Sequence, residues 1–229
     1  MSVVLRADDF FCRPSRSPPT KALPTVENMS ITREFFRHPM RTGAIAASSA
    51  RLAGVMTAGL GVESAHSVVE LGSGTGVFTE VLLRMLQRDA HFTAIEINTH
   101  LVQELRERFP SLHVAEGSAE HVAAYVTMPV DVVVSGLPWT AMHAAPQTAV
   151  LNAVCEVLSP QGRFTTFAYA HTAWTPPARR FARLLRSRFA VVERTSVVWR
   201  NLPPAYVYRA ALPVRSGLDR YGQPASATS

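Results

Sequence analysis

Short apolar runs alternate with amphipathic stretches along most of this chain. The apolar runs predict strands at residues 68–71, 91–96, 112–116, 130–135, 163–170, 190–200 and 205–212. Apolar residues three or four apart predict helices at residues 78–88, 98–109, 147–158 and 176–188. The fourth run is apolar throughout, as in a parallel strand buried on both faces, and only four residues separate the last two runs. The pattern predicts an α/β fold with a seven-stranded, mostly parallel sheet that ends in an antiparallel C-terminal hairpin.

The two ends of the chain lack this periodicity. The first part is rich in proline, serine and arginine, and the last part is short and polar, so both are expected to be disordered. The chain is expected to divide into a tail (1–28), an N-terminal helical segment (29–62), a main domain (63–213) and a second tail (214–229).

The N-terminal helical segment carries two further patterns. Residues 31–41 predict a short helix with phenylalanines on one side and arginines on the other. Such a helix is typical of an element that lies on a membrane, although packing of its phenylalanines on the domain explains the pattern equally well. Residues 42–53 are mostly small, and Ser48 or Ser49 is suited to cap a following helix. We expect this stretch to lie over the open end of a ligand cleft as a lid.

Composition limits the class of protein. The 229 residues, 47% of them hydrophobic, are enough for one domain of ordinary size with extensions. No apolar run approaches the roughly eighteen residues of a membrane span, and the first residues lack a signal peptide, so a cytoplasmic protein is expected. The 2 cysteines are too few for a zinc site and are not expected to form a structural disulfide. The net charge of +6 comes almost entirely from arginine, which suits an anionic lipid surface or nucleic acid.

A glycine-rich segment carries the first chemical signal. Glu70 ends an apolar strand, and Gly72, Gly74 and Gly76 alternate with Ser73 and Thr75 before the next helix begins. Glycine permits the tight turn and the approach of a ligand to the backbone, and the helix start offers unpaired N–H groups. The spacing matches neither a P-loop nor the glycine order of dinucleotide-binding folds.

A second acidic residue lies where a β-α-β unit binds ribose. Glu96 ends the second predicted strand, 20 residues after Gly76, and Ile97 follows it. A carboxylate at this place accepts hydrogen bonds from the two ribose hydroxyls of a nucleoside cofactor. The alternative is that Glu96 only caps the next helix and that the glycines form a structural turn.

These features resemble the class I methyltransferases, and further segments resemble one family among them. The segments are Phe36-Arg37-His38-Pro39, Thr42-Gly43-Ala44-Ile45, Ser135-Gly136-Leu137-Pro138 and Arg200-Asn201-Leu202-Pro203-Pro204-Ala205. Together with the glycine motif they are similar to the bacterial phospholipid N-methyltransferases, which methylate phosphatidylethanolamine, over about residues 31–209. These enzymes are in turn similar to the ribosomal RNA adenine dimethylases.

The resemblance implies a Rossmann-like fold and S-adenosylmethionine as cofactor, with S-adenosylhomocysteine as product. It implies no metal. The turn after the third strand corresponds to the adenine contact, but Ser118 stands where an aspartate is common, and Ala119 follows it. The expected cofactor-binding residues are Glu70, Gly72, Ser73, Gly74, Gly76, Glu96, Ile97, Ser118, Ala119 and Ser135.

The reaction of such an enzyme needs an amine aligned in line with a methyl group and with its proton removed. Ser135 and the carbonyl groups of Gly136 and Leu137 follow the fourth strand, where we expect them to hold the amine by hydrogen bonds. Candidate proton acceptors are Tyr169, His143 and His171, each of which has the alternative of being an ordinary loop or core residue.

Three further residues are candidates for binding the acceptor. Trp139 is placed either to line the methyl pocket through cation–π contact or to pack in the core. Arg200 and Tyr206 are candidate contacts to a lipid phosphate, the alternative for Arg200 being an exposed hairpin arginine.

The leading hypothesis is a methyltransferase of a lipid amine, peripherally associated with the inner face of the membrane and its anionic lipids. An RNA adenine methyltransferase is a weaker alternative, because the C-terminal domain of the ribosomal enzymes is missing and Ser135 replaces their usual asparagine. A small-molecule methyltransferase of specialised metabolism remains a second alternative. A scaffold that had lost its chemistry would show a damaged glycine motif, which is intact here.

Overall fold

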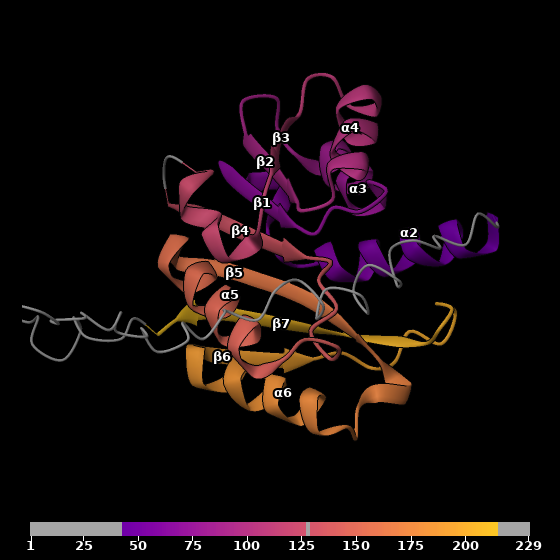
Figure 1. Ribbon diagram of the computed structural model, residues 1–229, viewed down its shortest axis with the longest axis vertical. Coiled ribbons are helices and arrows are strands. Elements are labelled where there is room, and N and C mark those ends of the chain that lie inside the picture. Colours follow the sequence, from indigo (N-terminus) through magenta and orange to yellow (C-terminus); the bar gives the residue numbers. More distant parts are fainter. Residues whose placement is uncertain (1–42, 127–128, 215–229) are drawn as a thin grey trace, which may run out of the picture.

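The computed structural model describes residues 43–126 and 129–214, with side chains from Ala50 onward. Within these residues seven strands form one sheet in the order β3-β2-β1-β4-β5-β7-β6 (Figure 1). β7 is antiparallel to both of its neighbours, and all the other pairs are parallel. The predicted seven-stranded, mostly parallel α/β sheet with an antiparallel C-terminal pair is confirmed.

The elements follow one another as strand and helix through most of the chain. The strands are β1 (Ser67–Leu71), β2 (His91–Glu96), β3 (His113–Glu116), β4 (Val130–Ser135), β5 (Leu158–Tyr169), β6 (Phe189–Arg194) and β7 (Ala205–Pro213). The α-helices are α2 (Gly43–Thr57), α3 (Val77–Met85), α4 (Thr99–Arg108), α5 (Ala144–Val157) and α6 (Pro176–Arg188). Short 3-10 helices are η2 (Val62–Ser64), η3 (Ala119–Ala124) and η4 (Ala170–Thr172).

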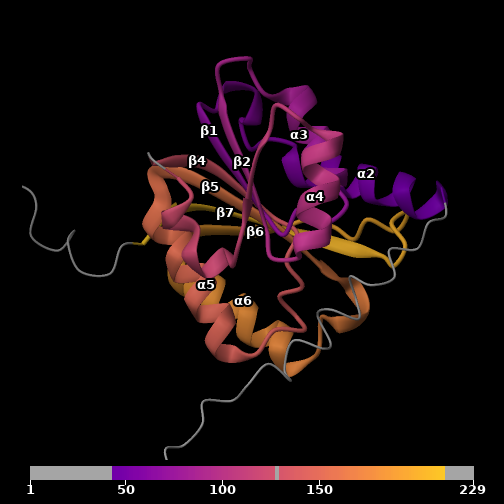
Figure 2. The same cartoon turned by 45° about the horizontal axis from the view of Figure 1, so that its top comes forward.

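Helices cover both faces of the sheet. Successive strand residues point to opposite faces, so Val68 packs with α2 and α3, whereas Val69 belongs to the cluster under α5 and α6. On β2, Phe92 and Ala94 share the α2 and α3 face, and Ala94 packs there with residues of α4. Figures 1 and 2 show this arrangement, with α5 and α6 on one face and α2, α3 and α4 on the other. The central strands are therefore buried on both sides, as their continuous valine content predicts.

The helix α2 begins earlier than the sequence pattern indicates. It starts at Gly43, so the prediction that Ser48 or Ser49 caps its N-terminus is wrong. From Ala50 on it packs on the sheet, where Leu52 and Met56 are buried. Its N-terminal half extends past one edge of the sheet in Figures 1 and 2, and its role as a lid stays a prediction. The predicted basic helix at 31–41 and both predicted tails, apart from Val214, lie outside the described residues.

Two strand boundaries also differ from prediction. β6 ends at Arg194 rather than at residue 200. The Val207 N–H, which would donate to a backbone carbonyl if the strand continued, donates to the Thr195 hydroxyl instead. The connection to β7 is therefore the ten-residue stretch 195–204 and not a tight turn. β5 begins at Leu158, which pairs with Val130 ahead of an irregularity in the register. Among the described residues, no helix has both the length and the apolar character needed to cross a membrane.

Candidate active site

The parallel strands β1 to β5 all end at one edge of the sheet, called the carboxyl edge below. Leu71 pairs there with both Ile95 and Ser135. The next residues link the strand ends further, since the Gly72 N–H donates to the Ile95 carbonyl and the Gly136 N–H to the Leu71 carbonyl, each at 2.8 Å. The residues predicted to bind the cofactor and those predicted to hold the amine are thereby brought to one edge.

The glycine loop between β1 and α3 has a backbone conformation that is unfavourable for residues with a side chain. Gly72, Gly74 and Gly76 have φ angles of 71°, 55° and 80°, a left-handed region that L-residues other than glycine seldom adopt. α3 then begins with Gly76 as N-cap and without a side-chain cap. The N–H groups of its first turn are thus left for solvent or a ligand, at the positive end of the helix dipole.

The loops after β1 and β4 lie against each other. A Cβ on Gly136 would come within 2.6 Å of the Gly72 carbonyl oxygen, and one on Gly72 within 2.8 Å of the Leu137 side chain. The contact with a backbone oxygen makes glycine a steric requirement at position 136, whereas at Gly72 the Leu137 side chain can move and the φ of 71° is what favours glycine. A cofactor in the glycine loop would therefore lie beside the residues predicted to hold the amine.

Glu96 fastens the glycine loop to the end of β2. Its Oε2 accepts the Gly74 N–H at 2.9 Å, and its Oε1 accepts the N–H groups of Ile97 and Asn98 at 2.9 and 3.0 Å. A carboxylate has about four acceptor positions, so about one, on Oε2, remains for a ribose hydroxyl. The alternative prediction is that Glu96 only caps the next helix. The N-cap of α4 is instead Asn98, whose side chain accepts the N–H groups of His100 and Leu101.

Glu70 is fully buried beneath the glycine loop. The Thr79 hydroxyl donates to its Oε2 at 2.6 Å, whereas its Oε1 and the nearby buried Ser73 Oγ have no hydrogen-bond partner among the described residues. Burial raises the pKa of Glu70 from 4.5 to about 7, and the hydrogen bond from Thr79 opposes this rise. Buried polar atoms without partners are rare, and here they indicate a polar ligand in the loop.

The ligand-free protein is expected to lose stability as the pH rises from about 4.5 to about 7. In this range the unfolded chain has released the proton of Glu70, while the folded protein still retains it. The full shift corresponds to a loss on the order of 3 kcal/mol. Thermal unfolding followed from pH 5 to pH 8 measures it, and Glu70→Gln should remove this component. An identical pH dependence in the wild type and the variant would contradict the prediction.

The turn after β3 supplies the other wall of the predicted cofactor site. Ile97, just after β2, leaves an apolar side chain 57% exposed at the carboxyl edge, as the flat face of an adenine requires. The Ser118 hydroxyl accepts the Glu120 N–H and caps η3, so its proton is left to donate to a ligand, and Ala119 is buried behind it. Tyr125, which the sequence pattern did not indicate, brings its hydroxyl against Gly117, where a Cβ would be only 1.9 Å away.

Trp139 packs in the core, which was one of its two predicted roles. Its ring stacks on Phe181 at 4.6 Å between centroids, and its Nε1–H donates to the Ser135 hydroxyl at 3.0 Å. Ser135 is buried too, and its carbonyl oxygen accepts a hydrogen bond from the Thr166 hydroxyl. The Ser135 side chain therefore supports the loop after β4 from behind, and Trp139 is not placed to line a methyl pocket.

The two predicted carbonyl acceptors differ in their hydrogen bonding. The Leu137 oxygen accepts the Trp139 N–H at 2.9 Å within a turn. The Gly136 oxygen accepts no hydrogen bond from the residues that the structure describes. Gly136 is thus the better placed of the two to accept a hydrogen bond from an amine.

A row of four aromatic rings extends along the face of the sheet that α2 and α3 cover. Phe78 meets Phe167 at 6.0 Å, Phe167 meets Tyr169 at 5.4 Å, and Tyr169 stacks on His171 at 5.7 Å between ring centroids. The row begins beside Gly136, whose added Cβ would lie 3.5 Å from the Phe78 ring. Aromatic faces attract sulfonium and ammonium groups, which was the role predicted for Trp139.

The candidate proton acceptors lie in two different places. Tyr169 and His171 belong to this aromatic row, and burial raises the pKa of Tyr169, so its phenol stays protonated and is no base at neutral pH. His143 is exposed at the N-terminus of α5, where its side chain makes no capping hydrogen bond. His143 is on a loop beyond the predicted amine-binding residues, and its catalytic role stays a prediction.

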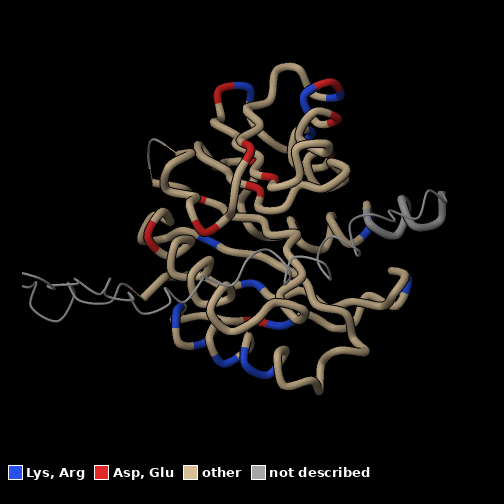
Figure 3. The backbone as a smooth tube through the Cα atoms, in the orientation of Figure 1, with Lys and Arg blue, Asp and Glu red and all other residues tan. Residues whose placement is uncertain are grey.

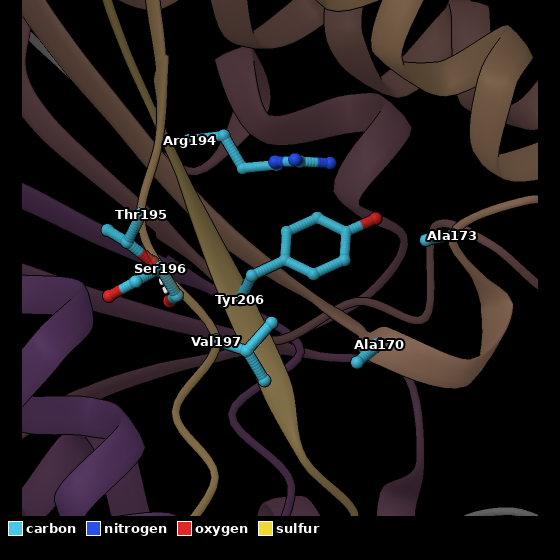
Figure 4. A pocket seen from close by; sticks show the side chains of 7 residues that line it. All are labelled: Ala170, Ala173, Arg194, Thr195, Ser196, Val197 and Tyr206. Carbon is cyan, nitrogen blue, oxygen red and sulfur yellow. Dashed lines mark hydrogen bonds between the residues drawn. The ribbon is translucent and has the colours of Figure 1, made fainter.

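A pocket of about 270 Å³ opens at the ends of β5, β6 and β7 (Figure 4). Arg194 and Tyr206 lie on one another within it, with the guanidinium carbon 5.1 Å from the ring centroid. In the described part of the chain the guanidinium of Arg194 has no hydrogen bond or ion pair, so its donors are left for a ligand. Tyr206, predicted to bind the lipid phosphate, faces this pocket, whereas Arg200 is exposed on the loop 195–204 and does not line it.

The predicted cofactor fits this edge. Glu70 and Ser73 present buried polar atoms without partners, Glu96 keeps an acceptor position, and Ile97 offers an exposed apolar surface. The glycines themselves are required by the positive φ angles of the loop and, at Gly76, by the close packing of Leu105 and Phe109. The roles predicted for these residues stay predictions: the glycine loop for the amino-acid part of S-adenosylmethionine, Glu96 for its ribose, and the surface formed by Ile97 and Ser118 for its adenine.

Comparison with known proteins finds methyltransferases. A family model described as a methyltransferase domain matches residues 68–162. An ornithine lipid N-methyltransferase from Singulisphaera acidiphila is 30% identical over 184 residues, which cover 76% of this chain and 91% of that protein. A ribosomal RNA small subunit methyltransferase A from Salinibacter ruber is 35% identical over 105 residues, but these cover 45% of this chain and 31% of that protein.

Solved structures share the fold. One is the N-methyltransferase NodS from Bradyrhizobium japonicum in complex with S-adenosylhomocysteine, which has a TM-score of 0.59 and 14% sequence identity to this chain. The match covers 82% of this chain and 98% of NodS. The fold is therefore the Rossmann-like class I methyltransferase fold, and the protein is an enzyme that uses S-adenosylmethionine and releases S-adenosylhomocysteine. Because the similarity spans almost the whole ornithine lipid enzyme, the chain belongs to the family of bacterial lipid N-methyltransferases.

Proposed function

We propose that this enzyme methylates the primary amine of a zwitterionic membrane lipid, either phosphatidylethanolamine or an ornithine lipid, as a peripheral protein at the inner face of the membrane. The observation that carries the proposal is the similarity along 91% of the ornithine lipid N-methyltransferase. Both headgroups combine a primary amine with an anionic group, so one site has to recognise a cation and an anion together.

The carboxyl edge is suited to the amine. When bound, S-adenosylmethionine supplies an electrophilic methyl group that an amine lone pair attacks in line. The Gly136 oxygen accepts one N–H of that amine, and the rings of Phe78 and Phe167 attract the positive charge on either side of the transfer. Tyr169 stays neutral, since burial raises its pKa, and the proton lost before attack passes to water.

The pocket at Arg194 is suited to the anionic group. An unpaired guanidinium donates two parallel hydrogen bonds to a phosphate or a carboxylate. Tyr206 fixes the guanidinium by cation–π contact, and Figure 4 shows the guanidinium beside the Tyr206 ring. We assign the anion of the headgroup to Arg194, which lines the pocket, rather than to Arg200, which does not.

The test is transfer of a radiolabelled methyl group to several acceptors in parallel. The acceptors are vesicles with phosphatidylethanolamine, vesicles with ornithine lipid, free phosphoethanolamine, and unmethylated ribosomal RNA. We expect label in the lipid phase, and chromatography of the product identifies which headgroup carries it. Label in phosphoethanolamine alone would indicate a small-molecule enzyme, and label in RNA alone would indicate a nucleic-acid enzyme; either result overturns the proposal.

Arg194→Gln is expected to raise the KM for the lipid at least tenfold and to change kcat little. A hydrogen bond between two charged groups contributes about 1.5–3 kcal/mol, and the amine and its methyl donor are not altered. Lipid dispersed in detergent micelles keeps vesicle binding out of the measurement. Arg186→Gln, on the exposed face of α6, is the matched control. A larger rise in KM for Arg200→Gln than for Arg194→Gln would contradict the assignment.

A further inference from the structure

Among the residues that the structure describes, the three most exposed large apolar side chains lie at the carboxyl edge. Trp199 is 75% exposed, Trp174 65% and Leu202 61%. Trp174 lies between η4 and α6, and the other two lie in the loop 195–204 that joins β6 to β7. We infer that these three side chains form a membrane-docking edge that inserts into the headgroup layer of a bilayer containing anionic lipid.

The two loops are neighbours in space. Tyr169 at the end of β5 pairs with Ala205 at the start of β7, and the Ala170 N–H donates to the Pro204 carbonyl at 2.8 Å. The loop 195–204 folds back on β7 through the Val198 N–H, which donates to the Ala205 carbonyl at 2.7 Å. Figures 1 and 2 show both loops at the same end of the sheet as the glycine loop. The docking edge therefore lies beside the site where the amine has to enter.

The chemistry of these side chains favours a lipid interface. An indole ring carries an apolar body and one N–H donor, so tryptophan is enriched where hydrocarbon meets polar headgroups. Each of the three leaves most of its surface in water, which is unfavourable unless a partner covers it. Leucine next to tryptophan fits acyl chains, and a leucine side chain has no flat ring on which a nucleic-acid base could stack.

The surrounding charge favours an anionic bilayer. The docking edge itself carries Arg194, the last residue of β6, and Arg200, and the stretch from 170 to 204 has one acidic residue, Glu193. Arg186 and Arg188 lie at the far end of α6, at the opposite edge of the sheet. Figure 3 shows most of the blue of α6 toward the end of the helix that is farther from the docking edge, so the positive charge at the edge comes mainly from the end of β6 and the loop after it. A basic residue close to a membrane with anionic lipids contributes about 1 kcal/mol to binding. The arginines at the edge thus attract the bilayer, and the docking edge fixes which side of the protein meets it.

This inference rests on the proposed function, because an enzyme that methylates a lipid amine has to reach that amine in a bilayer. It is separate from the predicted helix at 31–41, which lies in another part of the chain. The docking edge lies at the same end of the sheet as Arg194 and the aromatic row, which are on opposite faces of the sheet. Only the headgroup of a lipid then has to move from the bilayer surface into the site.

The first experiment measures which side chains enter the bilayer. The full chain is mixed with vesicles of phosphatidylcholine and phosphatidylglycerol, with and without brominated acyl chains, and tryptophan emission is recorded. Trp174 and Trp199 should shift to shorter wavelength and be quenched by bromine. The variant Trp174→Phe/Trp199→Phe retains only Trp139, which is buried, so its emission should not change. If brominated lipid does not quench the tryptophan emission of the wild type, the inference is overturned.

The second experiment measures binding. Trp174→Ser/Trp199→Ser/Leu202→Ser is expected to lower the fraction bound to the same vesicles at least tenfold in a flotation assay. The control Leu83→Ser/Val214→Ser removes exposed apolar side chains, 40% and 49% exposed, elsewhere on the molecule and should bind as the wild type does. Unchanged affinity for S-adenosylhomocysteine shows that the triple variant is folded. Equal vesicle binding by the triple variant and the control overturns the inference.

Activity separates this inference from the proposed function. The triple variant should lose activity on vesicles and keep it on the same lipid in detergent micelles. If the wild type binds vesicles through the docking edge but methylates no lipid, the proposed function fails and the docking edge stands. If the emission shift occurs with single-stranded RNA and not with vesicles, the edge is a nucleic-acid surface and the inference fails.

Discussion

Replacing Gly136 with alanine is expected to lower the rate of methyl transfer about a hundredfold. The added Cβ would lie 2.6 Å from the Gly72 carbonyl oxygen and 3.6 Å from that of Leu71. Both are backbone atoms of β1 and its glycine loop, so no side-chain rotation relieves the contact. The loops after β1 and β4 would have to separate, and a displacement near 1 Å between reacting groups costs about two orders of magnitude in rate.

The matched control is Gly54→Ala. Gly54 lies within α2, and a Cβ there meets no atom within 4 Å. This substitution is expected to stabilise the protein by about 0.5–1 kcal/mol, because alanine favours a helix over glycine by that amount, and to leave activity unchanged. Calorimetric titration with S-adenosylhomocysteine and thermal unfolding are run on both variants. Wild-type activity in Gly136→Ala would show that the two loops do not need their close contact.

The features of the site that the sequence predicts are those that depend on local geometry. A strand, a turn that only glycine permits and a helix start are neighbours in the chain, so Gly72, Gly74 and Gly76 reveal the loop without any knowledge of the fold. Glu96 follows from the same reasoning, since a β-α-β unit has a nearly fixed length and returns the second strand beside the first.

The features that the sequence did not reveal depend on contacts between distant segments. The burial of Trp139 depends on Phe181 of α6 and on the Ser135 hydroxyl, so its position after β4 indicated a ligand contact just as well. Phe167 and Tyr169 are two apart in β5 and therefore share a face, a signal that was present in the pattern. Their contact with Phe78, which places that face beside the glycine loop, requires the fold.

The end of β6 shows the same limit. The residues from 195 to 200 have a strand-like composition, but the Thr195 side chain takes the place of a backbone partner for Val207. The chain then leaves the sheet and exposes Trp199 on a loop. Because the strand ends at Arg194, the guanidinium is held at the carboxyl edge next to Tyr206. A longer strand would have made Arg200 the better candidate, as the sequence pattern indicated.

Glu96→Gln is expected to weaken binding of S-adenosylhomocysteine at least tenfold and to lower the melting temperature by several degrees. The Glu96 carboxylate accepts N–H groups on both oxygens, from Gly74 on one and from Ile97 and Asn98 on the other. Glutamine offers one acceptor oxygen, so its NH₂ group must face an N–H whichever way the amide turns. Loss of a charged acceptor contributes about 1.5–3 kcal/mol, which is tenfold or more in affinity.

Glu116→Gln separates the two roles of Glu96, as fastener of the glycine loop and as acceptor for ribose. Glu116 is paired with Glu96 across β2 and β3 but is exposed, so its substitution changes the charge at the same strand end without touching the loop. It should bind S-adenosylhomocysteine as the wild type does. If Glu96→Gln lowers the melting temperature but titrates with wild-type affinity, Glu96 only fastens the loop. A drop in affinity beyond what the loss of folded protein explains means that its remaining acceptor position on Oε2 holds the ribose.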